Sequence, residues 1–126
     1  MCRNGTLDVD AAAFFSPSGS WVQPSTKNAD LLKHEQGHYD MAELYALRLR
    51  QAILAAKVGC DDKAKANTAG EKMVAEFQRD WQSAERQYEE GTRYGTDLAK
   101  QQAASNMIAV ELKALSATNA GNPAKQ

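Results

Sequence analysis

The chain contains two histidines in 126 residues, and they lie four residues apart with a glutamate directly after the first. The segment His34-Glu35-Gln36-Gly37-His38 matches the pattern H-E-x-x-H. Because helix residues four apart differ by about 40° around the axis and about one turn along it, both imidazoles can reach one metal ion. Glu35 lies about 100° from His34, beside such a metal without being a ligand. The pattern predicts a zinc site in which Glu35 is the general base for attack of water on a carbonyl.

Zinc needs a third protein ligand, and the sequence has no further histidine to supply it. Asp40 and Glu43 lie about 240° and 180° from His34, on the wrong side of the same helix. The candidates therefore come from later in the chain: Glu85, Glu89, Tyr94 and Asp97. Each also has a purely structural interpretation, as a solvated helix charge, a helix-start residue or a core aromatic. Two ordinary histidines on an amphipathic helix are the corresponding alternative for the motif itself.

Composition narrows the class of protein. Hydrophobic residues make up 43% and charged residues 25%, which is typical of a globular domain. The formal net charge is −1, so no basic face for nucleic acid is expected. No apolar run approaches the roughly 20 residues of a membrane-spanning helix. We therefore expect neither a nucleic-acid partner nor a membrane span.

The elements that position the motif follow from the hydrophobic pattern. Residues 7–15 alternate between apolar and polar and predict a strand, and residues 20–22 predict a short returning strand after a turn. Residues 27–58 then read as one long helix, which carries the motif and stops at Gly59.

Residues 61–68 are polar and predict a connection, and residues 69–90 predict a second helix with a core-facing aromatic stripe. A third helix is expected from Thr96, as its cap, to Ser116, and residues 117–126 are expected to be a disordered tail. The prediction is a single α-rich α+β domain over residues 1–116, with an N-terminal β-hairpin followed by three helices.

A longer segment is more specific than the pentapeptide. The run from Leu31 to Ala46 resembles the core of a bacterial family of predicted secreted zinc-dependent proteases, first catalogued as a domain of unknown function. Ser20-Trp21-Val22, Tyr88-Glu89 and Thr92-Arg93-Tyr94-Gly95 resemble the family's flanking motifs in the same order. The resemblance covers residues 7–115 and implies a zincin-like minimal core with the motif on the first long helix.

One position departs from the family pattern. Where relatives tend to have histidine in a Thr-x-His-Gly step, this chain has Tyr94. By its position Tyr94 is the implied third zinc ligand, although zinc must first displace a proton from a group of pKa about 10. Asp97 and Glu89 are the alternatives, and a catalytically degenerate relative is a further one.

The resemblance also bears on location and covalent structure. Composition leaves open whether Cys2 and Cys60 form a disulfide or remain thiols, and the start of the chain shows no signal-peptide pattern. Such relatives are exported, which implies a periplasmic or secreted protein with a Cys2–Cys60 disulfide. The strand pair before the long helix is then a candidate edge for an extended substrate peptide, or a plain cover on the helices.

Two functions follow as expectations. The first is a zinc-dependent peptidase acting on a peptide or protein substrate, with His34, His38 and Tyr94 as ligands and Glu35 as base. The second is a non-catalytic envelope interaction or metal-binding module that keeps the shape of the motif.

Overall fold

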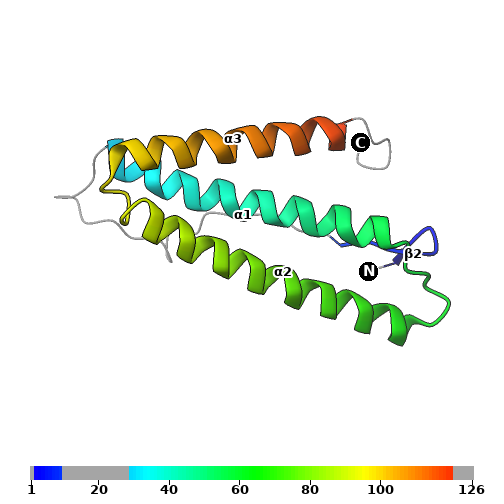
Figure 1. The fold of residues 1–126 in the computed structure, drawn as a ribbon. Coiled ribbons are helices and arrows are strands. Elements are labelled where there is room, and N and C mark those ends of the chain that lie inside the picture. Colours follow the sequence, from blue (N-terminus) through cyan, green and yellow to red (C-terminus); the bar gives the residue numbers. More distant parts are fainter. Residues whose placement is uncertain (1, 10–28, 121–126) are drawn as a thin grey trace.

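The computed structural model describes residues 2–9 and 29–120, and in this part of the chain a short hairpin is followed by three long helices (Figure 1). The elements are β1 (Cys2–Arg3), β2 (Thr6–Leu7), α1 (Ala29–Ala56), α2 (Lys63–Gly91) and α3 (Leu98–Ala120). This confirms the predicted α-rich architecture. None of the described helices is both long and apolar enough to cross a membrane.

The hairpin lies earlier in the chain than the sequence pattern predicts. Cys2 pairs with Leu7 and Arg3 with Thr6 in antiparallel register. Asn4 and Gly5 form the turn with positive φ angles of 53° and 78°, the backbone that a tight Asn-Gly hairpin requires. Of the strand predicted over residues 7–15, only Leu7 is in a strand, and the part from residue 10 lies outside the described residues. The predicted strand at residues 20–22, and with it the candidate peptide-binding edge, also lies outside them.

The hairpin is fastened to the segment that follows α1. The Leu7 amide donates to the Val58 carbonyl at 2.8 Å, and the Cys60 amide donates to the Gly5 carbonyl at 3.0 Å. A disulfide joins Cys2 to Cys60, with the two Cα atoms 6.2 Å apart. This confirms the pairing that the family resemblance implies.

The helix α2 starts six residues before the predicted Ala69, so the expected polar connection at residues 61–68 is mostly helical. Asp62 is the N-cap, and its side chain accepts a hydrogen bond from the Lys65 amide at 3.1 Å. One turn later Ala66 is fully buried in a core cluster with Leu7 and Ile53. The prediction was wrong there because the capping bond and one buried alanine outweigh a polar composition.

The helix α3 begins one residue later than predicted and extends further. Asp97, rather than Thr96, caps it, with its carboxylate accepting from the Lys100 amide at 3.0 Å. The helix continues to Ala120, so residues 117–120 belong to it, and residues 121–126 lie outside the described part.

In Figure 1, α1 runs through the middle of the molecule, with α2 along one side and α3 along the other. Both outer helices pack on α1, while α2 and α3 contact each other little. The cluster of Leu7, Ile53 and Ala66 lies at the hairpin end. A second buried cluster joins the three helices through Met41, Tyr88 and Ile108. Beyond this second cluster, near the start of α1, the bundle holds the two histidines.

Candidate metal centre

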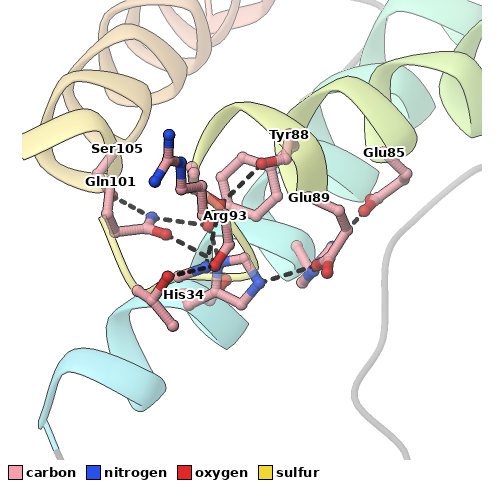
Figure 2. Close-up of polar contacts among 11 residues, drawn as sticks. His34, Glu85, Tyr88, Glu89, Arg93, Gln101 and Ser105 are labelled. Carbon is pink, nitrogen blue, oxygen red and sulfur yellow. Dashed lines mark hydrogen bonds and ion pairs between the residues drawn. The ribbon is translucent and has the colours of Figure 1, made fainter. Parts of the chain in front are cut away.

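Two imidazoles and one carboxylate converge between α1 and α2. The Nε2 atom of His34 lies 2.8 Å from Oε1 of Glu89 (Figure 2). The Nε2 atom of His38 contacts the same oxygen. One donor atom from each of these three side chains lies within 4.8 Å of the other two. His34 is only 3% exposed, whereas His38 and Glu89 are partly exposed. The arrangement brings together three donor atoms at a site that is open on one side.

The other ring nitrogen of each histidine has a partner of its own. Nδ1 of His34 lies 2.7 Å from Oε1 of Gln101 on α3. Nδ1 of His38 contacts the Glu85 carboxylate, which also accepts a hydrogen bond from the Trp81 indole at 3.0 Å. Outer partners of this kind fix the orientation and tautomer of metal-binding histidines. Both Nε2 atoms are thereby directed towards Glu89.

Tyr88 packs against both histidines, whose rings also contact each other edge-on. Its ring stacks on His34 with 4.9 Å between centroids and meets His38 edge-on at 4.8 Å. Its hydroxyl donates to the backbone carbonyl of His34 at 2.8 Å. This position requires Gly37, because a Cβ there would lie 2.0 Å from the Tyr88 hydroxyl oxygen. The glycine of the motif therefore lets α2 approach α1 closely beside the site.

The turn after α2 supports His34 from another side. Arg93, Tyr94 and Gly95 have consecutive positive φ angles of 52°, 58° and 85°. A Cβ on Gly95 would lie 2.7 Å from Cγ of His34, so only glycine fits against this imidazole. The amide of Gly95 donates to the hydroxyl of buried Thr92 at 3.2 Å, which fixes the turn in place.

The carboxylates set the charge of the site. Burial lowers the pKa of His38, but hydrogen bonds and charge attraction from Glu85 and Glu89 outweigh it and raise the pKa to about 8. Burial also raises the pKa of the Tyr88 hydroxyl, and the nearby carboxylates add to that rise against the hydrogen bond from Gln101. Tyr88 is therefore a neutral donor at physiological pH.

The structure brings together three of the residues considered from sequence: His34, His38 and Glu89, the last as an alternative third ligand. Tyr94 is 68% exposed, and its amide, not its phenol, contacts the end of α2 through the Glu89 carbonyl at 2.7 Å. Asp97 is the cap of α3. The structure thus puts Glu89, rather than Tyr94, beside the histidines, and Glu85 behind His38 as a partner.

Glu35 lies at the surface next to this cluster. Its side chain is exposed, and together with Leu32, Gln36 and Tyr39 it lines a shallow hollow of about 330 Å³. Its charge is close enough to contribute to the raised pKa of Tyr88. Glu35 is not part of the donor cluster of His34, His38 and Glu89.

The donor set fits zinc. Tetrahedral zinc with bonds of 2.0–2.2 Å places its ligand atoms roughly 3.3 Å apart, which lies between the 2.8 Å contact and the 4.8 Å limit of this cluster. Two imidazoles and a carboxylate, with one side open, match the ligands of catalytic zinc sites. Buried His34 is oriented by Gln101, and partly exposed His38 is oriented by Glu85.

Sequence reasoning did not find the supporting residues Gln101, Gly95 and Tyr88. The family resemblance includes Tyr88, next to Glu89, and Gly95, in the Thr92-Arg93-Tyr94-Gly95 step, but it implies no contact of either residue with His34. The spacing of Glu85, Tyr88 and Glu89 at three and four residues is a signal that all three share one face of α2. No local pattern marks Gln101.

Comparison with known proteins gives a family. No curated protein and no solved structure matches this chain. Residues 18–95, which include α1, α2 and all three members of the donor cluster, match the family described as bacterial protein of unknown function, DUF922. The match spans more than half of the chain, and the protein therefore belongs to the bacterial family DUF922.

Proposed function

We propose that this protein is a zinc-dependent peptidase in which His34, His38 and Glu89 bind the metal. The observation that supports this most directly is the convergence of three donor atoms within 4.8 Å beside the exposed Glu35. Hydrogen bonds from the two Nδ1 atoms to the oxygens of Gln101 and Glu85 leave both Nε2 atoms facing Glu89. An ordinary pair of surface histidines would not need such partners.

Zinc at this site would polarise a scissile carbonyl and lower the pKa of water towards about 7. Glu35 would accept a proton from the attacking water and pass it to the leaving amine. The hollow beside Glu35 is open to solvent and gives a peptide access to the carboxylate. Glu89 on α2 supplies the third ligand in this proposal, because Tyr94 is exposed at the surface.

The disulfide supports a location outside the cytoplasm. The Cys2–Cys60 disulfide is of the kind that persists in oxidising compartments. We propose that the protein works in the periplasm or outside the cell, on a peptide or protein substrate.

The test is zinc content and peptide cleavage in three variants. His38→Ala should abolish the one zinc per chain expected for the wild type. Glu35→Gln should keep the zinc and lose cleavage of a mixed peptide library, while Glu43→Gln, eight residues further along α1, should keep both. Equal zinc in wild type and His38→Ala would refute the metal site, and cleavage by Glu35→Gln would remove Glu35 from its role.

One observation favours a second function. His34 and His38 both contact Glu89 directly, and His38 contacts Glu85, so these side chains can also join α1 to α2 as ion pairs. A non-catalytic interaction module would use them in this way. Its signature is a thermal midpoint that does not change with zinc or chelator, together with no cleavage of any library peptide.

A further inference from the structure

Gln101 lies outside the family-matched segment of residues 18–95, on α3, and yet contacts the buried histidine of the motif. We propose that Gln101 is a positioning residue: it holds the proton of His34 on Nδ1, so that Nε2 is the nitrogen that binds the metal. The metal in this inference rests on the proposed function, whereas the position of the proton can be measured without metal.

A chain of hydrogen bonds begins at a backbone carbonyl, which can only accept. The His34 backbone carbonyl accepts a hydrogen bond from the Tyr88 hydroxyl at 2.8 Å. A hydroxyl has one proton, so Tyr88 must accept in its other contact, with the Gln101 side chain at 2.8 Å. The atom of Gln101 that faces Tyr88 is therefore its amide nitrogen.

The amide nitrogen of Gln101 is fully used. One hydrogen goes to Tyr88, and the other goes to the Ser105 hydroxyl at 3.1 Å (Figure 2). The carbonyl oxygen of Gln101 is left to face Nδ1 of His34 at 2.7 Å. Because an amide oxygen only accepts, Nδ1 of His34 must carry a proton, and Nε2, which faces the Glu89 carboxylate, is the nitrogen left to bind a metal.

Both partners of the hydrogen bond between Gln101 and His34 are buried. Gln101 is 1% exposed and His34 is 3% exposed, so water cannot readily replace either partner. Gln101 lies in the first turn of α3, where its backbone amide donates to the backbone carbonyl of Asp97 at 2.8 Å. The start of α3 at its cap residue Asp97 thereby determines where Gln101 lies relative to His34.

The same result is reached at His38 by different chemistry. Its Nδ1 contacts the Glu85 carboxylate, which can only accept when ionised. The two histidines are thus directed to use Nε2 by a neutral amide from α3 and by a charged carboxylate from α2. The third helix is in this way part of the metal site although it provides no ligand.

The first experiment measures the tautomer of His34 in the intact wild-type protein by ¹⁵N–¹H correlation spectra of the imidazoles. Zinc-free and zinc-loaded protein are examined under the same conditions. We expect a proton on Nδ1 in both, with Nε2 bound to zinc in the loaded form. An Nδ1 without a proton in either form, or zinc on Nδ1, would overturn the proposal whether or not any variant folds.

The second experiment measures zinc affinity in Gln101→Met, with Gln102→Met as the matched control on the exposed side of the same helix turn. Loss of an outer partner weakens metal binding by about 10–100-fold, and this is expected for Gln101→Met alone. Gln101→Glu keeps an acceptor for Nδ1 and should bind zinc more tightly than Gln101→Met. Equal affinity of wild type and a folded Gln101→Met would refute the positioning role.

The two proposals fail differently. If the wild type binds no zinc, the proposed function is wrong, and the zinc-free spectrum still decides where the proton of His34 lies. If the wild type binds zinc through Nδ1 of His34, the metal site stands and the role of Gln101 does not.

Discussion

The Tyr88 hydroxyl oxygen occupies the space directly above Gly37: a Cβ on that glycine would lie 2.0 Å from the oxygen and 2.7 Å from the ring carbon Cζ. This contact holds α2 against the motif of α1. It also places Tyr88 where it can stack on His34 and bond to its carbonyl. One variable position of H-E-x-x-H is therefore restricted to glycine by a neighbouring helix.

Gly37→Ala should force Tyr88 out of its place and disturb both imidazoles. We expect a loss of about 1–3 kcal/mol in the free energy of unfolding, as for other overpacked cores, together with weakened zinc binding. Gly91→Ala is the control, because a Cβ at Gly91 meets no atom within 4 Å. Urea titration and zinc titration of both variants measure the effect, and a Gly37→Ala variant as stable as Gly91→Ala would contradict the contact.

The third ligand can be identified by two conservative substitutions. If Glu89 binds the metal as proposed, Glu89→Gln should weaken zinc binding by more than the about 10–100-fold typical of an outer partner, because it would alter a direct ligand. Tyr94→Phe should leave the affinity unchanged, because Tyr94 is exposed. Zinc titrations with a competing chelator measure both, with Glu90→Gln as the control on α2. A larger loss of zinc affinity in Tyr94→Phe than in Glu89→Gln would indicate that Tyr94 is the third ligand.

Asp8 should make stability depend on acid pH. Its carboxylate is buried and accepts two hydrogen bonds from Arg50, at 3.1 and 3.0 Å. The bonds from Arg50 lower the pKa of Asp8 against the opposing effect of burial, and Val9 and Arg3 lower it further. A folded-state pKa below the unfolded value means that this contribution is present above about pH 4 and is lost as the pH falls through the folded pKa.

Asp8→Asn should therefore be less stable than the wild type at neutral pH by about 1.5–3 kcal/mol, the size of a hydrogen bond to a charged group. The difference between the two proteins should shrink as the pH falls below about 4, where Asp8 is protonated in the unfolded chain, and further as the pH falls through its lowered folded-state pKa. Chemical unfolding at several pH values measures this. A difference that stays constant down to pH 2 would mean that the Asp8 charge does not stabilise the fold.

Reduction of the disulfide should separate stability from metal binding. Cys2 and Cys60 close a loop of 58 residues, and the bond should contribute about 2–4 kcal/mol to the free energy of unfolding. The bond lies at the hairpin end, whereas the histidines lie near the start of α1. The double variant Cys2→Ser/Cys60→Ser should unfold at a lower temperature and bind zinc with unchanged affinity. Lost zinc binding at a temperature where the variant is folded would show that the two ends are coupled.

The sequence by itself determined that the motif lies on a helix and that His34 and His38 are on the same face of that helix. These depend on a period of 3.6 residues and on apolar patterning, which are local properties of the chain. It also indicated three helices, whereas the disulfide between Cys2 and Cys60 was implied only by the family resemblance. Element ends were less well predicted, because one capping bond from Asp62 decided the start of α2.

Only the tertiary structure decided which side chains meet the two histidines. Tyr94 and Glu89 are five residues apart, and the backbone turn through Arg93, Tyr94 and Gly95 leaves the tyrosine exposed while α2 directs Glu89 inward. Gln101 reaches His34 across 67 positions of sequence. Such contacts depend on how helices pack and where a cap begins the next one, and no local period encodes either.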